Sequence, residues 1–567
     1  MKFNYLTRIR IISICVFLFA LLLIGKLYVL QIVDHQTYLD KADKQYISAG
    51  GTLFSRGTIY FQNKDGTTVS AATLKSGFVV AINPTVLQNP EDAYLKLSAI
   101  LPIDHDTFIA KAAAKSEVYE EVAKQVDAET GQKIDALNIP GLNVYTERWR
   151  FYPGGSTAAN TIGILGYLGN NYAGRYGLES QYDSVLERTD DSSVNFFAQI
   201  FSNIKNMAEN NPDEGDIVTT IEPTVQSELE QELASTTAKW SSDFSGGIIM
   251  NPATGEIYAM ADYPTFNPND SSSVTNISVF SNPLVEDVYE MGSIVKPLTI
   301  AAGIDAGVIT ATSTFDDKGF VLVDGKKISD FDGKDRGVVT MQTVLSESLN
   351  VGAAHVVALL GNKTFTDYMY AFGLGQKTGI DLPNEAQNLV DNLNSTRDIE
   401  HFTASFGQGI ALTPVSTVRA LSAIANGGVL VNPHVVKQIN YITGLSKTFP
   451  TVSSQPVIKK STAIEVTRMM VYSVDNVLMN GTIKLPDYSV AAKTGTAQIA
   501  NPAGGGYYSD RFLHSFVGFF PAYDPKFFIF LYTVYPKGVQ YGSETLTEPF
   551  MDIVKFLINY YNIPPDR

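Results

Sequence analysis

Three short motifs that lie far apart in the chain limit the folds that this sequence can adopt. They are Ser293-Ile294-Val295-Lys296, Ser348-Leu349-Asn350 and Lys493-Thr494-Gly495-Thr496. A serine hydroxyl becomes an effective nucleophile only when a neighbouring base removes its proton. If Ser293 opens a helix, Lys296 lies one turn later on the same face and within reach of that hydroxyl. The three motifs in this order therefore predict an acyl-serine enzyme whose fold brings distant segments together.

Each residue of the first motif also has an ordinary structural explanation. Serine is common at helix N-caps, so Ser293 on its own would favour a cap. A lone Lys296 would favour a solvated surface position, but Leu298 and Ile300 continue a helix that is apolar on nearly every side. To accept a proton, a lysine must be neutral, and desolvation or a nearby positive charge lowers its pKa. Lys493 is the candidate for that charge.

The second motif offers a hydroxyl and an amide. Ser348 and Asn350 flank Leu349, and alternate side chains of a short loop project the same way. The hydroxyl could relay a proton, and the amide could bind a substrate backbone. For this motif alone, an ordinary helix cap is an equally good explanation.

The third motif lies in residues 488–498, which the sequence predicts to be a strand. Gly495 would let another backbone approach closely, and an extended peptide could pair with this strand. Thr494 and Thr496 could then bind a substrate carboxylate beside Lys493. A plain strand end is the weaker alternative.

Composition argues against several other classes of protein. The 567 residues suffice for several domains, and a hydrophobic content of 45% is that of a globular protein and not of a multi-span membrane protein. The formal net charge of -16 argues against a nucleic-acid partner and mainly favours solubility. Cys15 is the one cysteine, so no disulfide forms within the chain. The six histidines show no metal-ligand spacing, and we expect neither a metal nor another cofactor.

The N-terminus predicts a membrane anchor. Three basic residues precede a stretch free of charge, and apolar residues resume after Lys26. Together the two apolar parts, residues 11–33, are long enough to span a membrane, with Lys26 reaching toward an interface. A cleaved signal peptide is the alternative, but no small-x-small cleavage site follows the apolar run. The basic residues place residues 1–10 in the cytoplasm and the chain after the span outside the cell.

The region from residue 34 to residue 215 shows no convincing catalytic set, and we expect a stalk or docking module there. Its predicted strands are residues 51–54, 57–61 and 77–82, with a turn at Lys64-Asp65-Gly66. Residues 91–135 carry helical periodicity. A polar loop at residues 209–215 marks the predicted domain boundary.

The region from residue 216 onward alternates strands and helices and predicts an α+β or three-layer domain. Its expected elements are a strand at 216–221, a helix from Pro223 to about Ala238, a hairpin of 246–250 with 256–261, strands at 512–519 and 527–534, and a final helix near 548–560. The polar residues 267–282 are expected to form a loop near the active-site entrance.

From Asp216 onward the chain resembles the transpeptidase domain of class B penicillin-binding proteins. Beyond the three motifs, the similarity extends over Phe372–Pro383 (FGLGQKTGIDLP), Ser405–Pro414 (SFGQGIALTP) and Ala425–Gly428 (ANGG). The N-terminal region resembles the non-catalytic pedestal of that family through Arg56-Gly57-Thr58-Ile59 and Gly177-Leu178-Glu179. The resemblance implies a cytoplasmic tail (1–10), a transmembrane helix (11–33), an elongated mixed pedestal domain (34–215) and a transpeptidase domain (216–567) with a central antiparallel sheet flanked by helices.

The resemblance also implies a substrate, the D-alanyl-D-alanine end of a peptidoglycan stem peptide, and covalent inhibition by β-lactams. Ser293 would attack the penultimate carbonyl, Lys296 would act as general base, and Ser348 would pass the proton to the leaving amine. A membrane glycosyltransferase and other wall-synthesis proteins are the expected partners. The extracytoplasmic catalytic domain would be held at the cell membrane by a single span.

The remaining motif residues would bind the substrate. Asn350 would hold the donor peptide, and the catalytic Lys493 would meet its terminal carboxylate. Further substrate-binding residues implied by the resemblance are Thr494, Gly495 and Thr496. The backbone N–H groups of Ser293 and Thr496 would form the oxyanion hole.

Three departures from the family pattern leave the division or elongation role open. Met291 stands where proline is usual, Asn384 replaces a usual glycine, and residues 60–66 differ from the common pedestal sequence. A bifunctional enzyme would need a glycosyltransferase domain before residue 216, where no acidic catalytic pair is found. A β-lactamase would lack the pedestal. A β-lactam sensor or a non-catalytic scaffold for wall synthesis is the remaining alternative.

Overall fold

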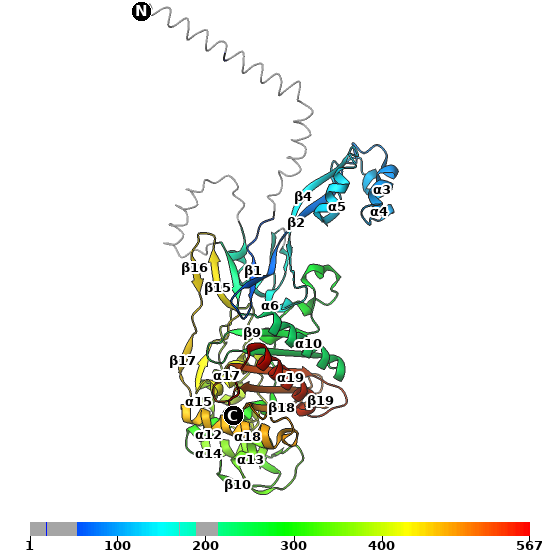
Figure 1. The fold of residues 1–567 in the computed structure, drawn as a ribbon. Coiled ribbons are helices and arrows are strands. Elements are labelled where there is room, and N and C mark those ends of the chain that lie inside the picture. Colours follow the sequence, from blue (N-terminus) through cyan, green and yellow to red (C-terminus); the bar gives the residue numbers. More distant parts are fainter. Residues whose placement is uncertain (1–18, 20–53, 169–170, 189–213) are drawn as a thin grey trace, which may run out of the picture. The chain divides into compact units, whose positions relative to one another are not determined.

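The computed structural model describes residue 19 and residues 54–168, 171–188 and 214–567, which form two compact units (Figure 1). Among these residues, the smaller unit contains Leu74–Arg150 and the residues before Gly57, and the larger contains Gly57–Thr73, Phe151–Arg188 and the rest up to Arg567. The predicted span over residues 11–33 lies outside the described residues, apart from Phe19. Within the described parts, no helix combines the length and the apolar character needed to cross a membrane.

The smaller unit combines three helices with strands β2 to β4. Its elements are the second part of β2 (Thr68–Ile82), α3 (Pro90–Ser98), α4 (His105–Ala113), β3 (Glu120–Val126), α5 (Ala128–Asp135) and β4 (Leu142–Phe151). Each helix begins at a polar N-cap whose side chain accepts a backbone hydrogen bond from the first turn. A small core includes Val80, Leu97, Phe108 and Ile134.

The helical periodicity predicted over residues 91–135 is wrong for residues 120–126. These residues form β3, which pairs antiparallel with β2 and places Val126 opposite Phe78. The pairing partner is distant in sequence, so the local apolar spacing does not reveal it. The strand predicted at 77–82 is present, but it is the end of a longer strand that begins at Thr68.

In the larger unit, a mixed sheet combines strands from the N-terminal part of the chain with strands from the later part. Its strands are β1 (Ile59–Gln62), the first part of β2, β7 (Gly215–Thr219), β15 (Val436–Tyr441) and β16 (Ser446–Thr448). β1 pairs antiparallel with β2 and parallel with β7, and β15 pairs antiparallel with β7. The predicted turn at Lys64-Asp65-Gly66 joins β1 to β2, and Gly66 has a φ of +86°. Of the strand predicted at 51–54, only Phe54 is described, and it is not in a strand.

The main sheet of the larger unit has five antiparallel strands in the order β18–β19–β20–β8–β9. They are β18 (Ala491–Ala500), β19 (Tyr507–Phe520), β20 (Phe527–Val534), β8 (Phe244–Met250) and β9 (Ile257–Tyr263). The predicted hairpin and the two predicted C-terminal strands are confirmed. Because β18 lies at an edge of this sheet, one side of its backbone is available for other contacts.

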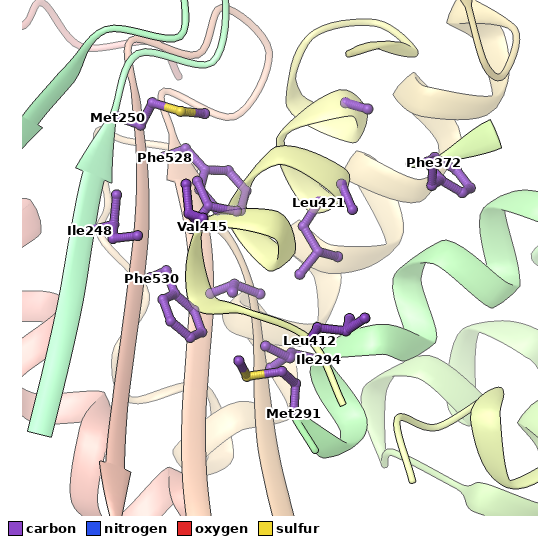
Figure 2. Packing of buried hydrophobic residues seen from close by; sticks show 14 of the residues in the cluster. Ile248, Met250, Met291, Ile294, Phe372, Leu412, Val415, Leu421, Phe528 and Phe530 are labelled. Carbon is purple, nitrogen blue, oxygen red and sulfur yellow. The ribbon is translucent and has the colours of Figure 1, made fainter. Parts of the chain in front are cut away.

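Helices cover both faces of this sheet. Successive side chains of a strand point to opposite faces, and β20 shows both sets. Phe528 belongs to the same buried cluster as Val415 of α17 (Pro414–Ala425) (Figure 2). Ile529 belongs to a second cluster with Leu229 of α10 (Pro223–Trp240) and Phe550 of α19 (Gly542–Tyr561). This burial on both faces explains the nearly continuous apolar sequence of β20, FFIFLYTV.

The final helix starts earlier than predicted, at Gly542. The side chain of Glu544 accepts the backbone N–H of Tyr541 there, and Pro549 lies inside the helix. A proline is common in the first turn of a helix, but Pro549 lies beyond the first turn of α19.

The remaining described helices and strands of the larger unit surround α12 (Lys296–Asp305) or join the main elements. The other helices are α6 (Ala159–Ile162), α7 (Gly177–Gln181), α8 (Asp183–Leu186), α11 (Pro283–Glu286), α13 (Met341–Ser346), α14 (Asn350–Leu360), α15 (Asn362–Ala371), α16 (Asp398–Ala404) and α18 (Lys460–Asn476). The other strands form four antiparallel pairs: β5 (Leu165–Leu168) with β6 (Asn171–Gly174), β10 (Thr314–Asp317) with β13 (Gly337–Thr340), β11 (Phe320–Val323) with β12 (Lys326–Ser329), and β14 (Val429–Val431) with β17 (Ser453–Pro456).

Candidate active site

Ser293 lies at the junction of a 3₁₀ turn and a helix. The turn η4 (Gly292–Val295) runs directly into α12 (Lys296–Asp305), and residues 296–303 are all buried. Gly292 has a φ of +66°, and a Cβ atom there would lie 2.8 Å from the carbonyl oxygen of Thr496. Glycine therefore lets the turn that carries Ser293 approach strand β18 closely.

Lys296 reaches back to Ser293, as a spacing of one helical turn allows. Its Nζ lies 2.9 Å from Ser293 Oγ, 2.8 Å from Asn350 Oδ1 and 3.1 Å from Ser348 Oγ. Nζ also donates to the carbonyl oxygen of Ser348. The lysine is 0% exposed, and all four of these oxygen neighbours are uncharged.

These neighbours suit a neutral amine that accepts the proton of Ser293. The Ser348 carbonyl oxygen and Asn350 Oδ1 can only accept hydrogen bonds. A neutral amine can donate its two N–H groups to them and keep its lone pair for the hydroxyl of Ser293. That is the arrangement of a general base beside a nucleophile.

Lys493, on β18, approaches Ser348 as well. Its Nζ donates to Ser348 Oγ at 2.9 Å and to the Thr494 carbonyl oxygen at 2.7 Å. Ser348 Oγ therefore contacts both lysines. Ser348 has a φ of +61°, in the left-handed region that serine rarely adopts, and the buried Leu349 anchors the loop behind it.

Burial lowers the pKa of both lysines. Removal from water disfavours the charged form, and it is the main reason that the pKa of Lys296 lies well below its ordinary value. The positive charge of Lys493 lowers the pKa of Lys296 further, whereas Asp330 opposes the shift. Burial lowers the pKa of Lys493 to about 7. The site therefore holds one lysine prepared to accept a proton and a second whose charge changes near neutral pH.

Gly495 and Thr496 continue the site along the edge strand β18. A Cβ atom at Gly495 would lie 2.3 Å from Ser515 Oγ and 2.8 Å from the carbonyl oxygen of Met291. Glycine thus permits the close packing of β18 against the turn that carries Ser293. Thr496 Oγ1 accepts a hydrogen bond of 2.9 Å from the backbone N–H of Gly542, where α19 begins.

The motif residues meet at a cavity of about 860 Å³. The motif residues that line it are Ser293, Ser348, Asn350, Thr494, Gly495 and Thr496. The two lysines are buried and contact this lining through Ser293 and Ser348. The structure therefore brings all the predicted site residues together from η4, α12, α14, β18 and the loop before α14.

The segment 267–282 does not line this cavity, so its expected place near the active-site entrance is wrong. It forms two short 3₁₀ turns, η2 (Pro268–Ser273) and η3 (Ile277–Phe280). Asn269 donates to the carbonyl oxygen of Tyr152, and Asn160 donates to that of Val279. These long-range hydrogen bonds, which local polarity does not reveal, hold the segment elsewhere.

Sequence reasoning missed several groups at the site. Lys326 and Lys327, on the hairpin of β11 and β12, line the cavity, and Asp330 follows that hairpin. No motif marks these residues. The ring centre of Phe406 lies 6.0 Å from Lys296 Nζ. This residue could have been predicted, because it falls in the stretch Ser405–Pro414 that resembles the family. In the part of the chain that the structure describes, no three or more possible metal ligands cluster.

Comparison with known proteins finds two matching family models. The model described as the penicillin binding protein transpeptidase domain matches residues 246–555, and that of the penicillin-binding protein dimerisation domain matches residues 53–220. Stage V sporulation protein D of Bacillus subtilis (strain 168) is 32% identical over 504 residues, covering 85% of this chain and 75% of that protein. Peptidoglycan D,D-transpeptidase FtsI of Buchnera aphidicola subsp. Schizaphis graminum (strain Sg) is 28% identical over 571 residues, covering 98% and 96%.

Two solved structures share the fold. Penicillin binding protein 3 from Mycobacterium tuberculosis, complexed with aztreonam, has a TM-score of 0.70 and 24% identity, covering 91% of this chain and 98% of that one. Penicillin binding protein 2X from Streptococcus thermophilus has a TM-score of 0.73 and 21% identity, covering 89% and 80%. At these identities the likeness concerns the fold alone.

Proposed function

This chain belongs to the penicillin-binding proteins that carry a transpeptidase domain, and we propose that it cross-links peptidoglycan stem peptides through an acyl-enzyme at Ser293. The observation that carries this proposal is the contact of 2.9 Å between Ser293 Oγ and the buried Nζ of Lys296. Relatives named peptidoglycan D,D-transpeptidases support the same reaction. The protein is a serine-type D-Ala-D-Ala transpeptidase of class B that acts in cell-wall synthesis.

In the first half-reaction, Ser293 Oγ attacks the carbonyl of the penultimate D-alanine while Lys296 Nζ takes the hydroxyl proton. The resulting tetrahedral intermediate collapses as the peptide C–N bond breaks. Ser348 Oγ, which contacts both lysines, passes its proton to the leaving amine and takes the proton of Lys296, so that Lys296 is neutral again. The products are an acyl-serine ester and free D-alanine.

In the second half-reaction, an amine from a neighbouring stem peptide attacks the ester. Lys296 takes a proton from that amine, and Ser293 regains a proton when its C–O bond breaks. A new amide bond then joins the two peptides, and the enzyme returns to its starting state. A β-lactam resembles the dipeptide end and acylates Ser293 in the same way.

The substrate is held by residues around these two side chains. Asn350 Nδ2 gives one N–H to the carbonyl oxygen of Ser329 at 3.0 Å and has a second N–H for the donor peptide. Protonated Lys493, with the hydroxyls of Thr494 and Thr496, binds the terminal carboxylate, while Gly495 lets the extended peptide approach. The backbone N–H groups of the nucleophile and of Thr496 form the oxyanion hole, where one donor contributes about 3 to 4 kcal/mol.

The domain division and the location are part of the proposal. Residues 11–33 form a single membrane anchor with residues 1–10 in the cytoplasm, which the basic residues before the apolar stretch support. Residues 34–215 form the pedestal, supported by the dimerisation-domain match, and residues 216–567 form the catalytic domain. A membrane glycosyltransferase is the proposed partner, because this enzyme forms only the peptide bonds of the wall.

Labelling by a fluorescent penicillin tests the assignment of the nucleophile. Ser293→Ala removes the attacking oxygen, so we expect no covalent label in a protein that still unfolds at the same temperature. The exposed Ser446 on β16 supplies the matched control, and Ser446→Ala should label like the unchanged protein. Labelling that persists in Ser293→Ala would refute the assignment.

A further inference from the structure

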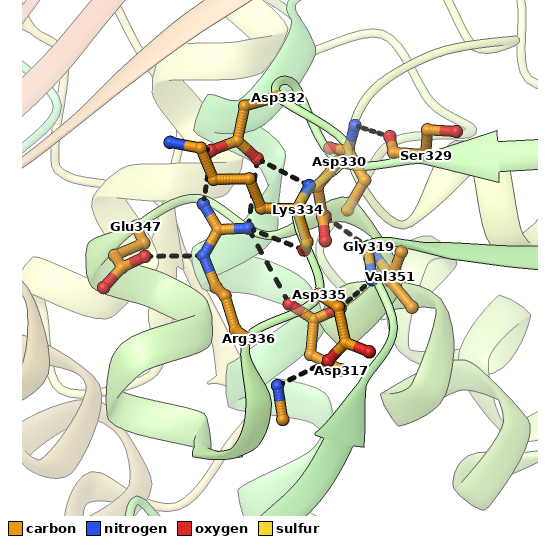
Figure 3. A network of polar contacts seen from close by, with 12 residues as sticks. Asp317, Gly319, Ser329, Asp330, Asp332, Lys334, Asp335, Arg336, Glu347 and Val351 are labelled. Atoms are coloured by element: carbon orange, nitrogen blue, oxygen red, sulfur yellow. Dashed lines mark hydrogen bonds and ion pairs between the residues drawn. The ribbon is translucent and has the colours of Figure 1, made fainter.

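A polar network contacts Glu347 and Val351, the residues on either side of the Ser348 and Asn350 motif (Figure 3). Helix α14 begins at Asn350, and its N-cap residue, Leu349, has no side chain that could cap it. Asp330 supplies the missing acceptor from another segment, since its Oδ1 accepts the N–H of Val351 at 3.0 Å. The preceding residue, Ser329, accepts Asn350 Nδ2 through its carbonyl oxygen. Two adjacent residues therefore hold the C-terminal side of the motif.

Arg336 holds the other side of the motif. Its Nε donates to Glu347, the residue before Ser348, at 2.8 Å. Its two terminal nitrogens bind both oxygens of Asp332 at 3.1 Å each. Ser348, in its unusual backbone conformation, is thus fixed from both sides by one segment, residues 329–336.

Asp330 is paired with a second buried carboxyl group. Asp317 is 0% exposed and Asp330 is 4% exposed. Gly319 links the two, because its N–H donates to Asp317 Oδ1 and its carbonyl oxygen accepts the N–H of Asp330. In the described structure, neither Oδ2 atom has a hydrogen-bond donor from another residue. Each carboxyl group is thus bound by a backbone N–H on one oxygen, Asp317 by Gly319 and Asp330 by Val351.

Charged groups of both signs act on this pair. Arg336 lies 3.9 Å from Asp317 Oδ2, and Lys296 interacts electrostatically with Asp330. Burial raises the pKa of Asp330 to about 6, and the charge of Asp317 contributes to this increase. In return, the negative charge of Asp330 raises the pKa of Lys296, against the effect of Lys493. The charge of Asp330 and the proton on Lys296 are therefore linked.

We propose that Asp330 is a positioning residue for the acylation of Ser293. It caps α14 and thereby keeps Ser348 and Asn350 in hydrogen-bond contact with Lys296. Its negative charge also adjusts how readily Lys296 accepts the proton of Ser293. This inference rests on the proposed function, because it concerns the same proton transfer. It assigns no contact between Asp330 and the substrate.

Two substitutions of Asp330 separate its capping of α14 from the effect of its charge on Lys296. Asp330→Asn keeps an oxygen for the N–H of Val351 and an N–H₂ for Asp317, but it cannot ionise. In a pH profile of the acylation rate, we expect the limb that rises with pH to move to lower pH by about half a unit to one unit, because Lys296 loses a neighbouring negative charge. Asp330→Ala also loses the cap, so we expect acylation about tenfold slower across the profile, with non-covalent β-lactam affinity within about twofold.

Asp316→Asn is the matched control. Asp316 precedes Asp317 on β10 but points to solvent, where it pairs with Lys318. This variant should leave the profile and the rate unchanged. An Asp330→Asn profile that coincides with that of the unchanged protein would overturn the charge effect, and equal rates for Asp330→Ala and Asp330→Asn at every pH would overturn the positioning effect. If Asp330→Ala does not fold, Asp330→Ser replaces it as the variant whose shorter side chain withdraws the acceptor from the N–H of Val351.

These results are independent of a failure of the proposed function. That failure would appear as penicillin labelling of Ser293→Ala, whatever the Asp330 variants do. A failure of the present inference would leave Ser293 as the labelled residue in every Asp330 variant, with an unchanged pH profile.

Discussion

Lysines in the two units of this protein show opposite chemistry. Lys133, on α5 of the smaller unit, lies 2.7 Å from Glu129 with 59% of its side chain exposed, and this partner raises its pKa. Lys493, on β18 of the larger unit, is 4% exposed, and burial lowers its pKa to about 7. The same side chain is a permanent cation in one place and a titrating group in the other. The two lysines differ in pKa because Lys493 is buried in an apolar core and Lys133 is exposed to water.

The two cores explain this contrast. In the smaller unit, one small cluster of apolar residues lies among three short helices and a few strand residues. In the larger unit, apolar clusters cover both faces of the main sheet, and α12 is buried along most of its length. Among the described lysines, the two whose pKa is lowered by burial, Lys296 and Lys493, both lie in the larger unit.

Removal of the amine from α12 should have the largest effect. Lys296→Met keeps an unbranched side chain but cannot accept a proton, so we expect acylation to slow by about 10²- to 10⁴-fold. Non-covalent β-lactam affinity should change far less, since Met fills similar space. Stopped-flow acylation with a chromogenic β-lactam measures both quantities. A variant that acylates at the normal rate would show that another base exists.

A matched pair of core substitutions tests whether penicillin labelling depends on the core of the larger unit and not on that of the smaller unit. Phe550→Ala and Phe108→Ala each remove a buried ring and should each cost about 3 to 5 kcal/mol of local stability. Phe550 stacks on Phe516, which lies opposite Thr494 in the sheet, so its loss should also impair penicillin labelling. Phe108→Ala should change hydrogen exchange in the smaller unit and leave labelling within about twofold. Equal loss of labelling in both variants would contradict this division.

Lys493→Met should stabilise the protein at neutral pH while impairing catalysis. The pKa of Lys493 is about 7 in the folded protein, below the ordinary value of 10.5, so between these values the unfolded chain binds more protons. The free energy of unfolding therefore rises with pH across this window as the cost of the buried charge disappears. Replacing the lysine removes that cost, and we expect a gain of about 1 to 3 kcal/mol at pH 7 that shrinks toward pH 10.

Chemical denaturation at pH 7, 8.5 and 10 measures this gain. A Lys493→Met protein that is less stable at pH 7 would mean that the hydrogen bonds of Lys493 to Ser348 and Thr494 outweigh its desolvation.

The smallest effect is expected for the exposed lysine of the comparison. Lys133→Met removes a solvated ion pair, which contributes little because water and salt screen it. We expect no measurable change in thermal stability or in penicillin labelling. A clear loss of either would show that surface ion pairs of the smaller unit matter more than their exposure indicates.

Local patterns predicted much of the larger unit correctly. The hairpin of β8 and β9 and the strands β19 and β20 follow from apolar runs and turn residues, and α10 follows from Pro223 and its helical sequence. Elements that depend on distant partners were missed. The strand β3 forms because β2 lies beside it, and the segment 267–282 is held by Tyr152 and Asn160 rather than by its own sequence.

The sequence by itself determined the spacing of Ser293 and Lys296, because three residues along a helix place Lys296 beside Ser293 whatever surrounds them. It also contained the second and third motifs that identify the family. Tertiary structure decided which lysines lose their charge, because desolvation depends on every neighbour that excludes water. It likewise brought Asp330 to the start of α14, a contact across 21 residues that no local pattern specifies.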